Sequence, residues 1–143
     1  MQRLSHFIAS AIMAAGIGSA AAVAGETPAP PGAKVWIIWP KDGEIIHGGK
    51  LWVRMGARNI GVAPAGVIKP KTGHHHLIID AELPPFDEDI PADKNHLHFG
   101  GGQTEARIEL SPGRHTLQLL MGDHDHIPHN PPLYSGRITV VVP

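Results

Sequence analysis

Glycine and proline interrupt this sequence so often that long regular elements cannot form between them. The 143 residues include 17 glycines and 14 prolines. Between these breaks stand short apolar runs, several of which alternate with polar residues, as in strands joined by turns. The expected strands are residues 34–39, 44–47, 51–58, 74–80, 104–110, 114–121 and 137–142. About seven short strands predict an all-β fold, an immunoglobulin-like antiparallel sandwich.

The three tryptophans stand near the start of the expected fold. Trp36 and Trp39 belong to the first strand, and Trp52 belongs to the strand at 51–58. Large aromatic side chains bury much apolar area when they pack inside a domain. We therefore expect these rings to pack in the core, with the mouth of the sandwich as the alternative place.

The N-terminus has the pattern of a secretory signal peptide. Arg3 supplies a positive charge, residues 7–23 are apolar, and Ala22-Val23-Ala24 has the form of a cleavage site. We therefore expect a signal peptide at 1–24, a flexible leader at 25–33 and a single β-sandwich domain at 34–143. The protein is expected to be periplasmic or secreted. It is not expected to span a membrane, because no later stretch approaches the roughly 20 apolar residues of a spanning helix.

Composition excludes several classes of partner and cofactor. The chain has 12 Lys and Arg against 13 Asp and Glu, so it has no basic excess with which to bind nucleic acid. It has no cysteine, which excludes thiolate sites such as zinc fingers, iron–sulfur clusters and blue copper. No P-loop, dinucleotide fingerprint or G-x-S-x-G nucleophile motif occurs. The many histidines predict stability or binding that changes between about pH 5 and 8.

Six of the 11 histidines form three His-x-His pairs. Residues i and i+2 of a strand point to the same face, so each such pair can offer two imidazoles to one ion. The candidate metal ligands are His74, His76, His96, His98, His126 and His129. They are too many for one tetrahedral ion, so three or four are expected to bind and the others to support them. Imidazole ligands without sulfur suit Cu(II) or Zn(II), so copper or zinc is the expected cofactor.

Each group of histidines also has a purely structural interpretation. Rings at 74–76 could hydrogen-bond to carbonyls of the long loop at 59–73, and those at 124–129 could be solvated loop side chains. The glycines at 100–102 could let the backbone approach a site closely, or could form a mere sheet corner. Asp123 and Asp125 could orient imidazoles by hydrogen bonds. His115 is expected to be a hydrogen-bonded core histidine.

Four segments give the chain a resemblance to a bacterial exported family. They are Gly61-Val-Ala-Pro-Ala-Gly66, Thr72-Gly-His-His-His-Leu-Ile-Ile-Asp80, His96-Leu-His-Phe-Gly-Gly-Gly-Gln-Thr-Glu105 and His115-Thr-Leu-Gln-Leu-Leu-Met-Gly-Asp123. The chain resembles the domain-of-unknown-function family 4399, and the resemblance extends from about residue 34 to residue 142. The resemblance implies a secreted or periplasmic β-domain and no particular activity. It also implies that His124 and the segment 55–61 are local departures from the family pattern.

Three functions are compatible with these features. The leading hypothesis is a non-catalytic, exported protein that binds Cu(II) or Zn(II). The alternative is a structural or interaction module of the cell envelope, whose partner is a protein or polymer and whose histidines only fix loops; it predicts rings more than about 10 Å apart, well beyond one metal's ligand shell. A third hypothesis is a Zn-dependent hydrolase with Glu105 as base, which requires a cleft beside that residue.

Overall fold

A computed structural model describes residues 25–143, so the expected signal peptide at 1–24 lies outside the described residues. Within 25–143 the chain forms strands and no helix, and therefore no helix long and apolar enough to cross a membrane. The strands are β1 (Lys34–Trp39), β2 (Glu44–Ile45), β3 (Lys50–Arg58), β4 (Gly61–Val62), β5 (Thr72–Ile79), β6 (His96–His98), β7 (Glu105–Glu109), β8 (Gly113–Gly122) and β9 (Ile138–Val142).

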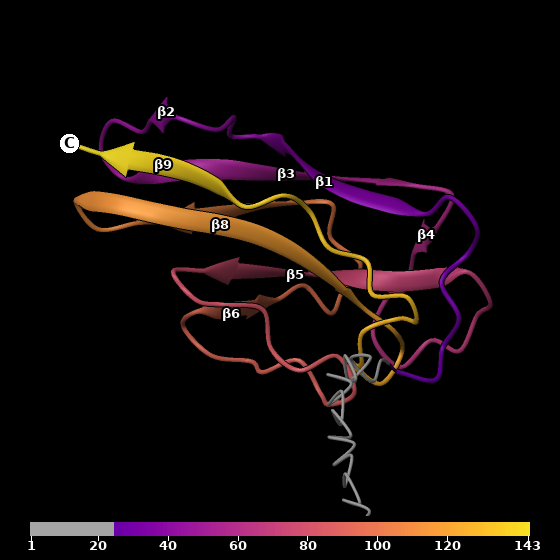
Figure 1. Cartoon of the computed structure of the whole chain (residues 1–143). Coiled ribbons are helices and arrows are strands. Elements are labelled where there is room, and N and C mark those ends of the chain that lie inside the picture. Colours follow the sequence, from indigo (N-terminus) through magenta and orange to yellow (C-terminus); the bar gives the residue numbers. More distant parts are fainter. Residues whose placement is uncertain (1–24) are drawn as a thin grey trace, which may run out of the picture.

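The strands form two sheets, which confirms the predicted all-β sandwich (Figure 1). The small sheet has the order β1-β3-β7, and the large sheet has the order β2-β9-β8-β5-β4 with β6 also paired to β5. The small sheet corresponds to the A-B-E order of immunoglobulin-like domains, and β9-β8-β5 corresponds to G-F-C. Six of the seven expected strands form this framework, namely β1, β3, β5, β7, β8 and β9, and β6 is not among the expected ones. The seventh, expected at residues 44–47, is the two-residue strand β2. The two-residue strands β2 and β4 add parallel pairings with β9 and β5.

The core lies between the two sheets and follows from alternation along the strands. In β3, Leu51 and Val53 point inward while Trp52 and Arg54 point outward. Leu77 of β5 and Leu117 of β8 face them from the large sheet and are fully buried. Full burial of one such side chain stabilises the fold by roughly 1.5–3 kcal/mol.

The tryptophans differ from the expectation of core packing. Trp36, Trp39 and Trp52 are 42%, 37% and 50% exposed. In β1 the inward positions belong to Val35 and Ile37, so the indole at 36 is left on the outside. We call the outward side chains of β1, β3 and β7 the tryptophan face. Apart from Lys34, both sets of alternating positions in β1 are apolar, so residue type alone does not decide which set is buried. Trp39 would follow the inward set, but the register shifts between Ile37 and Trp39, and Trp39 pairs with the outward Arg54.

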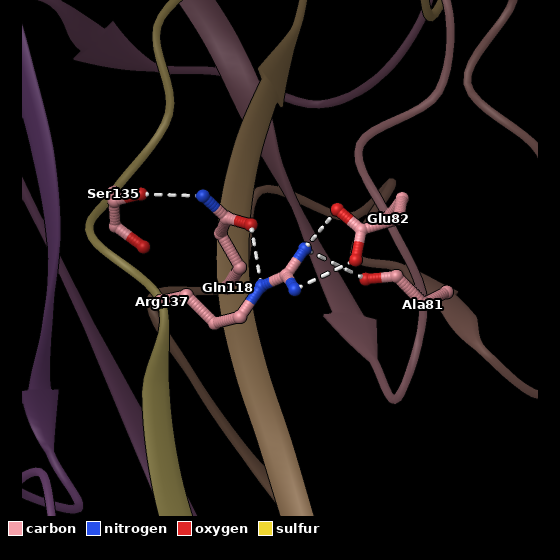
Figure 2. Close-up of polar contacts among 5 residues, drawn as sticks. All are labelled: Ala81, Glu82, Gln118, Ser135 and Arg137. Carbon is pink, nitrogen blue, oxygen red and sulfur yellow. Dashed lines mark hydrogen bonds and ion pairs between the residues drawn. The ribbon is translucent and has the colours of Figure 1, made fainter.

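Loops cover the outer face of the large sheet and form a second, smaller core. Ile78 and Leu120 point away from the main core and pack against Ile90 of the loop at 80–95. Figure 2 shows how a polar network ties this loop to β8 and to the segment before β9. Arg137 donates two hydrogen bonds to the Glu82 carboxylate, of 2.8 and 2.7 Å, and its Nε approaches Gln118 Oε1 at 3.5 Å.

His115 lies near the start of β8 and is hydrogen-bonded as expected, although it is only partly buried and does not lie in the core. Its Nδ1 is 2.6 Å from Asp80 Oδ2, and its Nε2 donates to the carbonyl of Ser111 at 2.8 Å. The hydrogen bond from His115 to the Asp80 carboxylate raises the pKa of this imidazole. Because both ring nitrogens face acceptors, the contact favours the imidazolium form.

Residues 25–33, for which a flexible leader is expected, lie against the loop at 123–131. The amide of Ala29 donates to the carbonyl of Asn130, and the amide of Asn130 donates to the carbonyl of Thr27, both at 2.8 Å. The Thr27 hydroxyl donates to Asp123 Oδ2 at 2.6 Å. This N-terminal segment therefore supports a loop that, as described next, carries a histidine of the site.

Candidate metal centre

The pairing of β5 with β6 brings three histidines together on the outer side of the large sheet. His74 and His76 share one face of β5 because they stand at positions i and i+2. In the antiparallel register, His76 lies directly opposite His98 of β6. Side chains of such cross-strand neighbours start within about 5.5 Å of one another. Alternation and register together therefore place the three rings in one group.

The ring nitrogens of this group converge to the spacing of a metal's ligands. His74 Nε2 is 3.0 Å from His76 Nε2 and 3.2 Å from His98 Nε2. One nitrogen from each residue falls within 4.8 Å of both others. Zinc–nitrogen bonds of about 2.0–2.1 Å in a tetrahedron place the nitrogens about 3.3 Å apart. The spacing thus fits one ion at the centre.

Hydrogen bonding among neutral rings does not satisfy this arrangement. Each nitrogen of a neutral imidazole has either one proton to donate or one lone pair to accept with. His74 Nε2 faces two other ring nitrogens at hydrogen-bonding distance. It can form one good bond with them and not two. A cation would accept the lone pairs of all three nitrogens at once, which makes a metal ion the more complete partner.

His126 brings a fourth ring to the group. Its ring centroid is 4.7 Å from that of His98 and 5.1 Å from that of His74. The residue has φ = 68°, a left-handed conformation that is uncommon for residues other than glycine. Its amide donates to the carbonyl of Asp123, and its carbonyl accepts from the amide of Ile90 at 2.9 Å. The loops at 80–95 and 123–131 therefore hold the ring in place together.

Burial keeps the inner two histidines uncharged. Desolvation, and then repulsion from His98 and His126, lowers the pKa of His74 to about 4. Desolvation and the neighbouring histidines lower the pKa of His76 to about 2. The pKa of His98 is also lowered, chiefly by burial and then by His126. Neutral imidazole is the form that can donate a lone pair to a metal.

Two glycines leave the room that the rings occupy. Gly122 is the register partner of His74, and a Cβ at position 122 would lie 3.0 Å from His76 Nε2. A Cβ at Gly100 would lie 2.4 Å from His98 Cε1. The glycines at 100–102 could have served close approach to a site or a sheet corner. At position 100 the backbone approaches the site closely, as the first interpretation predicts. Glycine beside a His-x-His pair is a sequence signal that could have indicated the grouping.

The other candidate histidines have different partners. His96 Nδ1 is 2.9 Å from Asp93 Oδ1, and His129 Nε2 donates to the carbonyl of Thr72 at 3.1 Å. His124 Nε2 lies 3.1 Å from Asp125 Oδ2. His75 points to the core side of β5, where neither of its buried ring nitrogens has a hydrogen-bond partner among the described residues. The structure thus brings together four of the six candidates, with His96 and His129 outside the group.

Asp123 shapes the loop and does not orient an imidazole by hydrogen bonding. Its Oδ1 accepts from the amides of Asp125 and Ile127, at 2.9 and 3.0 Å. The buried Nδ1 atoms of His74 and His76 have no hydrogen-bond partner in the described part of the chain. The carboxylate therefore supports the group indirectly, through the turn that presents His126.

Glu105 lies on the opposite side of the sandwich from the histidine group and is not placed to act as its catalytic base. It belongs to the outer side of β7 in the small sheet, and its carboxylate lies 3.5 Å from Arg54 Nε. The histidine group belongs to the opposite outer face, on β5 and β6 of the large sheet. The hydrolase hypothesis loses the residue on which it depended.

Comparison with known proteins agrees with the resemblance drawn from the sequence. The model of a family described as "Domain of unknown function (DUF4399)" matches residues 53–143. No curated protein matches the chain. A solved structure of fibronectin(III)-like modules of CbhA from Clostridium thermocellum is 16% identical, covers 76% of this chain and 92% of its own, and has a TM-score of 0.37.

Proposed function

The chain belongs to the DUF4399 family, and we propose that it is an exported protein that binds one Cu(II) or Zn(II) ion through His74, His76 and His98. The observation that carries this proposal is the convergence of three Nε2 atoms, two of them buried within a sheet face. Polar rings are placed together in this way at a cost, because burial without hydrogen-bond partners destabilises a fold. A bound ion offsets that cost.

His126 is the fourth ligand in this proposal. Its ring stands beside those of His74 and His98, and it would have to turn toward the three nitrogens that already lie within 4.8 Å of one another. Nitrogen-only ligation suits both metals, and the intrinsic order of affinities favours Cu(II). Because His98 is exposed, the ion can enter the site from solvent and can be passed to another carrier. We therefore propose binding or delivery as the role, and not catalysis.

Titration calorimetry with a Cu(II) or Zn(II) salt tests the proposal. We expect one ion per chain, bound more tightly than about 1 µM, as is usual for a site with several imidazole ligands. His98→Gln is the informative variant, because its exposed side chain is not needed for the core. It should weaken binding at least about tenfold. His96→Gln is the matched control on the same strand and should leave the affinity unchanged.

Nitrogen hyperfine structure in the electron paramagnetic resonance spectrum of the copper-loaded protein gives an independent reading of the ligands. Three or four coupled nitrogens are expected in the wild type and one fewer in His98→Gln. Binding weaker than micromolar for both metals, or equal losses in His98→Gln and His96→Gln, would overturn the proposal.

The envelope-module hypothesis is the second candidate, and one observation favours it. His129 is fully buried and hydrogen-bonds to the carbonyl of Thr72, as expected of a histidine that fixes the loop before β5. The same hypothesis predicts widely separated rings, which does not describe His74, His76 and His98. If neither metal binds, this hypothesis is the one that remains.

Export is the part of the proposal that rests on the sequence alone. Expression of the full chain in a Gram-negative bacterium should yield a periplasmic protein. Intact-mass measurement should then give a chain that begins at Gly25. A product that keeps residues 1–24 and stays in the cytoplasm would contradict it.

A further inference from the structure

The tryptophan face carries every tryptophan of the chain, and all three are exposed. Trp36 lies flat against the sheet, because a Cβ at Gly56 would meet its ring atoms at 2.3 to 2.7 Å. A group of exposed large aromatic side chains on one face commonly marks a binding site. The face therefore offers flat aromatic rings, set into a sheet, to a partner.

A groove runs between two of these rings. It has a volume of about 380 Å³ and is lined by Trp39 and Trp52 together with His47, Lys50 and Arg54. That volume falls in the range of small-ligand sites, roughly 300–1,000 Å³. The groove combines aromatic walls with hydrogen-bond donors, and none of its lining residues is acidic.

The charge of the face differs from that of the whole protein. Five cationic side chains point outward from the small sheet, and two carboxylates accompany them, although the formal net charge of the chain is −1. The cations are Lys34, Lys50, Arg54, Arg58 and Arg107. Glu105 and Glu109 lie 3.5 and 3.9 Å from Arg54 and Lys50. These pairs are exposed and weak, so both cations remain able to bind another anion.

We propose that the tryptophan face binds an acidic polysaccharide, with sugar rings stacked on Trp39 and Trp52 and sugar carboxylates bound by Arg54. The apolar C–H face of a sugar ring fits the flat face of an indole. The guanidinium group matches a carboxylate with two parallel hydrogen bonds. A polymer with one charge per sugar would satisfy several cations along the sheet at once.

The same features disfavour other partners. A second copy of the chain would bring two cationic faces together across a two-fold axis, where they repel. Insertion into a membrane needs an apolar surface that can enter the lipid headgroup region. The carboxylates of Glu105 and Glu109 stand on this face and would have to be desolvated.

Binding to polygalacturonate tests the proposal, with the fully methyl-esterified polymer as the matched neutral probe. The purified protein should bind the acidic polymer in calorimetry or affinity electrophoresis, and its affinity should fall as salt rises. Trp39→Ala and Trp52→Ala should each weaken binding at least about tenfold, as for a central aromatic contact. Arg54→Gln should remove most of the preference for the acidic polymer.

Tyr134→Ala is the control variant, because Tyr134 is similarly exposed but is not part of this face. It should bind like the wild type. Circular dichroism identifies any variant that fails to fold, and Arg54→Gln then tests the surface without removing a ring. Equal binding of both polymers, no binding, or binding only to vesicles that contain phosphatidylglycerol would overturn the proposal. Metal loading is measured separately and should not change the result.

Discussion

The two outer faces of the sandwich differ in an unusual way: one buries polar histidines, and the other exposes aromatic tryptophans. On the large sheet, loops at 80–95 and 123–131 cover the face and bury His74 and His76. On the small sheet no loop of residues 25–143 covers the tryptophan face, and three indoles are exposed. Histidine is usually less buried than such residues as leucine, and an exposed aromatic cluster is unusual. The exceptions on both faces coincide with the places where we propose binding.

The largest expected effect tests whether the covered face really contributes a second core. Leu120→Ala should destabilise the protein by about 3 kcal/mol, because this fully buried side chain packs under Ile90. Ile38→Ala on the tryptophan face should cost less than about 1 kcal/mol, because that side chain is already exposed. Urea denaturation of both variants measures the difference. Equal losses would remove the contrast between the faces.

The second largest effect is expected from metal addition, which should stabilise the covered face. Zinc at 100 times its Kd should raise the free energy of unfolding by about 2.7 kcal/mol, because the ion binds the folded chain and not the unfolded one. Thermal unfolding with and without a chelator measures the change. The shift should fall to about 1.4 kcal/mol or less in His98→Gln, whose Kd is expected to be at least about tenfold higher, and should persist in full in Trp52→Ala. A shift of equal size in both variants would mean that the ion binds elsewhere.

Adding a single methyl group at Gly122 tests whether metal binding depends on the space that this glycine leaves for the rings, separately from the stability of the fold. Gly122→Ala places a Cβ against His76 Nε2 and should reduce metal affinity about tenfold by displacing that ring. Gly136→Ala is the control, since a Cβ there meets nothing within 4 Å. Calorimetry with zinc measures both variants. Unchanged affinity in Gly122→Ala would show that the site can adjust around the added methyl group.

The smallest effect on stability is expected from the ion pair between Asp80, which follows β5, and His115. Asp80 raises the pKa of His115 in the folded state, so the pair stabilises the protein below the unfolded value of about 6.5 and loses this contribution as pH rises through the raised folded value. Asp80→Asn should therefore cost up to about 1 kcal/mol at about pH 5.5 and less at about pH 8.5. The amide oxygen can still accept from the Thr116 amide.

Urea denaturation at the two pH values measures this difference. His47→Gln is the control, because His47 is exposed and forms no ion pair within residues 25–143. A loss of stability in Asp80→Asn that is the same at both pH values would contradict the proposed role of the charge.

Local pattern was sufficient to predict seven of the nine strands, without β4 and β6, and the shared face of His74 and His76. Alternation depends only on neighbouring residues, and it placed His74 and His76 on one side of β5 and His75 on the other. The pairing of His76 with His98 could not be predicted this way, because it depends on the register between two strands joined by a long loop.

The exposure of the tryptophans could not be predicted, and neither could the way in which the predicted ligand His126 joins the group, for a related reason. Apart from Lys34, β1 is apolar at both sets of alternating positions, so its inward side is decided by the sheet that faces it and not by its own sequence. His126 reaches the group through a left-handed turn and through contacts between two loops. Such contacts are tertiary, and a single sequence has no periodic signal for them.

The three-residue strand β6 has a further consequence for the protein at high concentration. It pairs with β5 on one side and with no other strand of residues 25–143 on the other. An ion held jointly by His76 and His98 would fasten this short strand to the sheet. If the ion is removed and β6 separates, the backbone groups of β5 that it covered become free to pair with another chain. We therefore expect the metal-free protein to be the form that self-associates on storage.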